Sequence, residues 1–168
     1  DGGAVITYDI GLSQKMRILR SHGQTSKNWT VHLGGNFRLD TIQAAVLLAK
    51  LPFVKNLLSR RYENARLYND QLKDIPDIIL PPRNTQHTYN QYVIRVKNRE
   101  ELMDQLKWND IGHAVYYPCS ISAQPLFKSY GTSVMSKTLS KEMLALPIGP
   151  FTTEEEIMHV CTIIREFY

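Results

Sequence analysis

Residues 92–106 read YVIRVKNREELMDQL and place a strand pattern directly before a helix pattern. Apolar side chains alternate along the first part, which is typical of a strand with one buried face, here formed by Tyr92, Ile94 and Val96. Asn98 and Glu101 have the spacing of a capping box, which predicts a helix that carries Leu102, Met103 and Leu106. We expect the strand to begin at Tyr89.

Downstream of this unit the alternation of strand and helix patterns continues. Gly112 is expected to end the helix, and residues 113–117 are expected to form a further strand. A helix is predicted over residues 134–143. A second capping box, Thr153 with Glu156, precedes a helix with a stripe of apolar residues. Residues 83–168 are therefore predicted to form one small α/β domain.

Upstream, the period is helical from about residue 40. Pro52 is expected to interrupt the run, and a longer helix then carries an apolar stripe to Leu72, typical of a core or an interface. Residues 1–38 include a predicted strand at residues 4–8, which has no obvious hairpin mate and therefore needs neighbours from elsewhere. The predicted division is 1–38, a helical connector over 39–82, and the domain 83–168.

Composition excludes several classes of function. The net charge is +4 and the basic residues are mixed with acidic ones, which favours a solvated surface over a nucleic-acid site. The two cysteines are far apart and the five histidines lack metal-ligand spacing, so no metal is expected. No apolar run approaches the ~20 residues of a membrane span, and the start has neither a signal-peptide pattern nor a methionine. A cytoplasmic location is expected.

General catalytic motifs do not disclose a reaction. The sequence has no GxGxxG or P-loop spacing around its glycines, and its serines lack the GxSxG elbow of hydrolases. Each histidine is interpreted as structural or solvated. Taken by themselves, these residues leave the chemistry open.

Six segments carry a further signal and run from one end of the chain to the other: residues 1–7 (DGGAVIT), 20–23 (RSHG), 34–45 (GGNFRLDTIQAA), 92–96 (YVIRV), 116–125 (YYPCSISAQP) and 146–155 (LPIGPFTTEE). Together, and in this order, they resemble the DegT–DnrJ–StrS family of sugar aminotransferases. Each segment alone is a weak signal, whereas their order and spacing make the resemblance specific.

The resemblance implies the carboxy-terminal part of an aspartate-aminotransferase-like enzyme of fold type I. Such enzymes use pyridoxal 5'-phosphate and act as homodimers with shared active sites. They move an amino group, usually from glutamate, to a nucleotide-linked keto-sugar in amino-sugar or surface-polysaccharide biosynthesis. The family's Schiff-base lysine would lie upstream of Asp1, so this chain alone is expected to be inactive and to hold no catalytic residue.

The same resemblance nominates four binding residues. Asn36 corresponds to an asparagine that reaches the cofactor phosphate of the partner subunit, and Arg38 is expected at the same phosphate, at the substrate, or in a salt bridge that holds the loop. Tyr117 and Gln124 are expected on the substrate side.

Three positions depart from the family pattern, and one of them is Gly35, which stands where an aromatic is common. Ser122 and Asn90 stand where histidine is common, which puts the substrate contacts in question. The alternative function is a non-catalytic remnant or binding module that uses the small-domain fold to hold a partner protein or sugar nucleotide.

Overall fold

The computed structural model describes residues 2–84, 86–131 and 133–168. Asp1, the first residue of the Asp-Gly-Gly segment, lies outside the described residues. Contacts divide the chain into two compact units, Asp1–Phe53 and Val54–Tyr168. The predicted three-part division stays a prediction, although these contacts group the long helix that begins at Val54 with the carboxy-terminal unit.

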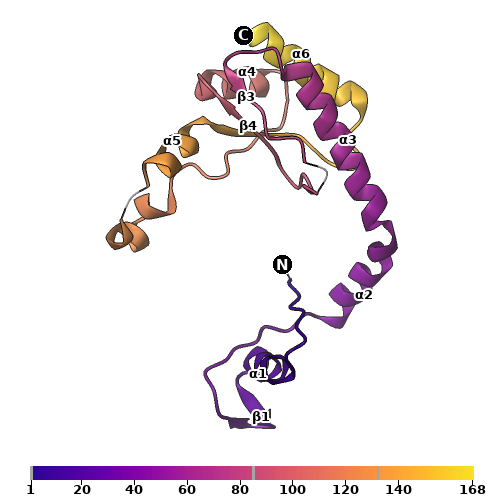
Figure 1. The fold of residues 1–168 in the computed structure, drawn as a ribbon, viewed down its shortest axis with the longest axis vertical. Helices are drawn as coiled ribbons and strands as arrows, with labels where there is room; N and C mark the ends of the chain where they lie inside the picture. Colours follow the sequence, from indigo (N-terminus) through magenta and orange to yellow (C-terminus); the bar gives the residue numbers. More distant parts are fainter. Residues whose placement is uncertain (1, 85, 132) are drawn as a thin grey trace. The chain divides into compact units, whose positions relative to one another are not determined.

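The amino-terminal unit contains two helices and a small hairpin (Figure 1). Its elements are α1 (Ile10–Arg20), β1 (Gln24–Ser26), β2 (Trp29–Thr30), α2 (Thr41–Lys50) and the 3-10 turn η1 (Leu51–Phe53). The β1–β2 pair is antiparallel. Asp9 caps α1, because its Oδ1 accepts from the Leu12 amide at 2.9 Å. The hairpin lies in a polar stretch of the sequence between α1 and α2.

The strand predicted at residues 4–8 was wrong. The structure assigns no strand to this segment, and Val5, Ile6 and Tyr8 are exposed. The local pattern was that of a buried strand, but a strand also needs a neighbouring strand to bond with. Within the described residues no such neighbour pairs with it.

Pro52 interrupts the α-helical run, as the sequence predicted, because α2 ends at Lys50 and the longer helix begins only at Val54. It lies in η1, which joins α2 to α3 (Val54–Leu72). Residues Thr41–Leu72, with a mean hydropathy of 1.3 in their most apolar window, are long and apolar enough to cross a membrane, and none of that window is buried. Length and composition are weak evidence for a span, because apolar helices covered by other protein surfaces share them.

The carboxy-terminal unit has a three-stranded sheet with helices packed on it. Its elements after α3 are β3 (Ile78–Ile79), β4 (Tyr92–Val96), α4 (Arg99–Trp108), η2 (Ile121–Ala123), η3 (Pro125–Tyr130), α5 (Val134–Glu142), β5 (Met143–Leu146) and α6 (Glu154–Phe167). The strand order is β3-β4-β5 and both pairings are antiparallel. Central β4 places Ile94 opposite Leu144.

Several boundaries differ from the sequence prediction. β4 begins at Tyr92 rather than Tyr89, and the predicted helix over 134–143 gives way to β5 at Met143. The predicted strand over 113–117 is reduced to a single bridge between Ala114 and Ala145. The box at Asn98 also fails, because Asn98 has a left-handed conformation (φ 54°) and its side chain makes no cap bond.

The core of this unit lies between the sheet and helices α3, α4 and α6. Figure 1 shows α3 and α6 side by side, and the two helices are in contact. Alternate β4 residues are buried, as their spacing predicted, and they join a cluster that includes Tyr68, Leu72, Leu102, Leu106, Leu144, Ile157, Cys161 and Ile164. The second capping box is confirmed: Thr153 Oγ1 accepts from the Glu156 amide, and Glu156 Oε2 accepts from the Thr153 amide.

Candidate functional site

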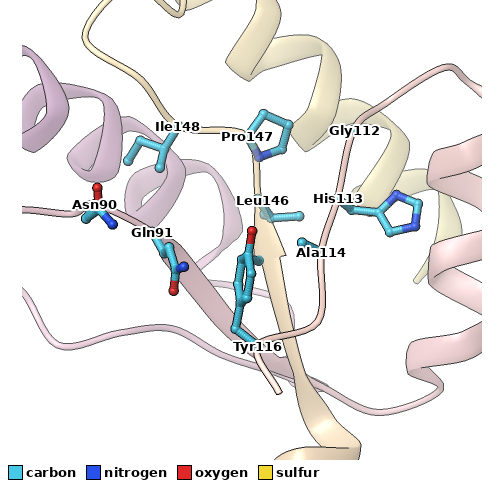
Figure 2. Close-up of a pocket in the computed structure, with 10 residues that line it drawn as sticks. Asn90, Gln91, Gly112, His113, Ala114, Tyr116, Leu146, Pro147 and Ile148 are labelled. Atoms are coloured by element: carbon cyan, nitrogen blue, oxygen red, sulfur yellow. The ribbon is translucent and has the colours of Figure 1, made fainter. Parts of the chain in front are cut away.

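A pocket of about 410 Å³ opens at the end of the sheet in the carboxy-terminal unit. Three chain segments line it: Asn90–Gln91 before β4, Gly112–Ala114 with Tyr116, and residues 145–148 at the end of β5. Figure 2 shows the Tyr116 ring standing among these segments, with its hydroxyl directed toward Leu146 and Pro147.

Strand pairing brings the three segments together. Tyr92 at the start of β4 lies opposite Leu146 at the end of β5, so the residues just before β4 face those just after β5. On the other side, Ala114 and Ala145 exchange backbone hydrogen bonds of 3.1 and 2.8 Å. The pocket is therefore built on paired backbone, which gives its walls a fixed spacing.

The polar groups of the pocket are neutral amides, a phenol and an imidazole. Asn90 and Gln91 supply carboxamides that both donate and accept, and Tyr116 supplies a hydroxyl. The Nδ1 of His113 lies 3.0 Å from the Ile111 carbonyl oxygen. Neither a carboxylate nor a lysine or arginine is among the residues that line the pocket. Such a lining suits a neutral ligand with hydroxyl or amide groups.

Helix α3 supports the pocket from behind through side chains that the sequence analysis missed. Arg61 donates to backbone carbonyl oxygens both before β4 and after β5, whereas Asn64 and Tyr68 donate to carbonyl oxygens after β5. Burial raises the pKa values of Tyr68 and of Tyr92, so both phenols are neutral donors. The recurrence of polar residues at positions 61, 64 and 68 on one helix face was the available signal.

The nominated cofactor residues lie in the amino-terminal unit. Asn36 and Arg38 are both exposed, and the Arg38 Nε donates to Asn36 Oδ1 at 3.0 Å. The structure thus brings these two residues together. The Asn36 carboxamide nitrogen and the Arg38 terminal nitrogens are donors of the kind that bind phosphate oxygens.

Tyr117 and Gln124 do not line the pocket. Tyr117 is exposed, and its ring meets that of Tyr116 edge-on at 6.1 Å between centroids. Gln124 is exposed and precedes η3 as its cap residue. Tyr116, one residue from the predicted position, is the tyrosine that enters the pocket. Ser122 lies nearby in the chain and its hydroxyl is 3.1 Å from that of Ser120.

A metal centre has no support in the described part of the chain. Among residues 2–84, 86–131 and 133–168, no three His, Cys, Asp or Glu side chains are grouped as ligands. Cys119 is exposed and Cys161 is buried in the core, where burial raises its thiol pKa to about 12. Cys161 is therefore a packing residue and a poor nucleophile.

The chain belongs to the DegT/DnrJ/EryC1/StrS aminotransferase family, whose model matches residues 1–165. A pleiotropic regulatory protein of Geobacillus stearothermophilus is 36% identical, over 100% of this chain and 47% of that protein. A dTDP-3-amino-3,4,6-trideoxy-α-D-glucose transaminase of Streptomyces venezuelae is 31% identical, over 99% of this chain and 46% of that protein.

Solved structures agree with these relatives. NtdA of Bacillus subtilis, solved with bound cofactor PMP, matches with a TM-score of 0.79 and 26% identity, over 93% of this chain and 41% of that chain. The predicted family and fold class are confirmed, as is the pyridoxal-phosphate dependence of the family. The chain spans about half the length of the curated relatives it matches.

Proposed function

We propose that this chain is the carboxy-terminal part of a pyridoxal-phosphate-dependent aminotransferase that moves an amino group from glutamate to a nucleotide-linked keto-sugar. The observation that carries the proposal is the family match over residues 1–165, in which the six sequence segments keep their order. The transaminase from Streptomyces venezuelae, whose name specifies a dTDP-linked amino sugar, supports the substrate class. The product would serve amino-sugar or surface-polysaccharide biosynthesis.

The cofactor phosphate is assigned to Asn36 and Arg38. Their hydrogen bond fixes the position of the two side chains relative to each other, and their donor groups fit a phosphate anion. When bound, the cofactor supplies the electron sink for amino-group transfer. The catalytic lysine belongs to the part of the protein that precedes Asp1, so the chain by itself is inactive.

The pocket next to Tyr116 is assigned to the sugar. A sugar ring presents hydroxyl and ring-oxygen groups without charge, and the carboxamides of Asn90 and Gln91 match both kinds of group. Tyr117 and Gln124 remain proposed substrate-side contacts at its margin. In this assignment the carboxy-terminal unit recognises and orients the substrate.

A homodimer with shared active sites accounts for the exposed apolar surface of α2 and η1. Ile42, Leu47, Leu48, Leu51 and Phe53 are each more than half exposed. Contiguous apolar side chains of this kind indicate a surface that another protein surface covers. The second copy would bring its cofactor to Asn36, and the assembled enzyme is proposed to be cytoplasmic.

A non-catalytic binding module is the rival reading, and the comparisons do not favour it, because the matched family is one of aminotransferases. The decisive experiment uses the complete protein loaded with cofactor. L-glutamate and a set of UDP- and dTDP-linked 3-keto-hexoses are supplied, and 2-oxoglutarate and amino sugar are quantified. We expect both products in equal amounts. Cofactor binding without any amino transfer would overturn the proposal.

The phosphate contact has its own test in Asn36→Ala of the complete protein. Loss of the amide donor should weaken cofactor retention by about 1–3 kcal/mol, since the phosphate then lacks a partner. Cofactor release during dialysis, followed by absorbance, measures the effect. Asn56→Ala, which removes an exposed amide from α3, is the control. Unchanged retention in Asn36→Ala would remove Asn36 from the site.

A further inference from the structure

One side chain joins opposite walls of the sugar pocket. The Nη1 of Arg61 donates to the carbonyl oxygen of Tyr89 at 2.9 Å and to that of Asn90 at 3.3 Å. The same nitrogen lies 3.3 Å from the carbonyl oxygen of Ile148, a residue 87 positions further along the chain. Arg61 therefore connects the segment before β4 with the segment after β5.

Two further α3 side chains donate hydrogen bonds to the segment after β5, which forms the second wall of the pocket; the segment before β4 forms the first wall. The Asn64 amide nitrogen donates to Gly149 O at 2.9 Å and to Thr152 O at 3.1 Å. The Tyr68 hydroxyl donates to Pro147 O at 2.8 Å. Asn64 and Tyr68 hold only the second wall, whereas Arg61 alone among the three reaches both walls.

The first wall needs such support because its backbone is bent. Tyr89 has a φ of 43°, which lies in the left-handed region that residues other than glycine rarely adopt. Its ring is buried and lies against Tyr62 and Tyr92, so the bend is held from the side-chain end. The bond from Arg61 holds it from the carbonyl end. The next two residues, Asn90 and Gln91, carry the carboxamides of the pocket.

We propose that Arg61 is a positioning residue for the keto-sugar: it holds Asn90–Gln91 against Ile148 and thereby sets the spacing of the groups that recognise the neutral sugar. The inference rests on the proposed function. A positively charged guanidinium nitrogen that donates to several carbonyl oxygens holds them more firmly than a neutral donor does. Arg61 acts through the pocket walls and does not itself line the pocket.

The test compares Arg61→Gln and Arg61→Lys in the complete, cofactor-loaded protein. Arg60→Gln is the matched control, since it removes an arginine from the exposed neighbouring position of the same helix. Two reactions are measured separately. The first is conversion of the bound cofactor by L-glutamate, and the second is turnover of the UDP- or dTDP-linked 3-keto-hexose that the unaltered protein uses best.

We expect Arg61→Gln to raise the KM for the keto-sugar about tenfold, while kcat and the glutamate reaction stay within about twofold. Arg61→Lys should give an intermediate KM, because lysine keeps the positive charge but lacks the planar guanidinium group. Arg60→Gln should match the unaltered protein. Hydrogen exchange should quicken in residues 89–91 and 148–152 of Arg61→Gln and stay slow in β4.

Two results would overturn the inference. One is an unchanged KM in Arg61→Gln. Another is a parallel fall of the glutamate and keto-sugar reactions, which would mark Arg61 as a general stabiliser of the fold. If Arg61→Gln fails to fold, the KM of Arg61→Lys decides in the same way. Absence of any amino transfer by the unaltered protein is distinct from these, because it refutes the proposed function and this inference together.

Discussion

Removing one buried hydroxyl, in Tyr92→Phe, tests how α3 is joined to the sheet. Tyr92 is fully buried, and its hydroxyl donates to Asn69 Oδ1 on α3 at 2.8 Å. Asn69 is only 3% exposed, so water cannot replace the lost donor without rearrangement. The Tyr92 ring stacks on Tyr68 with 4.7 Å between centroids, and phenylalanine keeps that stacking.

The expected loss in the free energy of unfolding depends on which polar group loses its hydrogen-bond partner. Because the ring remains, burial of apolar surface is nearly unchanged, and the cost comes from the Asn69 carbonyl oxygen that loses its partner. An unsatisfied buried polar group costs about 1–3 kcal/mol. We therefore expect the free energy of unfolding to fall by about 1–3 kcal/mol. Tyr8→Phe, at a fully exposed tyrosine, should change it by less than about 0.5 kcal/mol.

Urea unfolding followed by far-ultraviolet circular dichroism measures both variants, with equal m-values as the condition for comparing midpoints. Asn69→Leu supplies the second arm, because it removes the acceptor. In the Asn69→Leu background the Tyr92→Phe change should cost at least about 0.5 kcal/mol less than it does alone. The same cost in both backgrounds, or a loss below about 0.5 kcal/mol in Tyr92→Phe, would refute the reasoning.

Three further predictions concern α6 and its buried Cys161. Thr153→Ala should lower the free energy of unfolding by about 1 kcal/mol, because Thr153 Oγ1 caps the Glu156 amide; an unchanged urea midpoint would contradict this. At about pH 8, iodoacetamide should label exposed Cys119 rapidly and buried Cys161 only after unfolding, as intact mass would show; equal labelling would refute the burial. Since burial raises the Cys161 pKa to about 12, the unfolded state loses this proton first, and stability should fall as pH rises from about 9 toward 12.

Elements whose signals are local were predicted well from sequence. The capping box of α6 lies within four consecutive residues, Thr153 to Glu156, and the structure forms both of its hydrogen bonds. The alternation in Tyr92–Val96 appears as alternate burial along β4. In each case the residues that decide the structure are the residues that form it.

Elements that depend on a distant partner were predicted poorly. β5 follows α5 without a break, and its residues are a short apolar run that periodicity cannot assign. Pairing with β4 makes it a strand. The opposite error occurred at residues 4–8, where β-forming residues lack a partner strand among the described residues. Whether a segment forms a strand is decided by its pairing with another strand. The sequence of a single segment does not specify that partner.

The contrast between local signals and distant partners also applies to the site residues. Asn36 and Arg38 are two positions apart, and the structure joins them as proximity in sequence allows. The bond from Arg61 to Ile148 spans 87 positions and left no trace in the motifs. Tyr117 was chosen over Tyr116 from a motif that contains both tyrosines. Which of two adjacent side chains enters the pocket is set by the backbone at Ala114, which pairs with Ala145.

Buried residues and the polar groups of the pocket are distributed unevenly over the two units. Helices α1 and α2 bury no residue within the described chain, whereas the carboxy-terminal unit has a continuous core. Under the proposed function the apolar side chains of the amino-terminal unit gain their burial in the assembled enzyme. The sugar pocket likewise offers hydrogen bonds without a carboxylate or lysine to move a proton. Under the proposed function this chain contributes recognition and positioning of the substrate, and the Schiff-base lysine comes from the rest of the assembled enzyme.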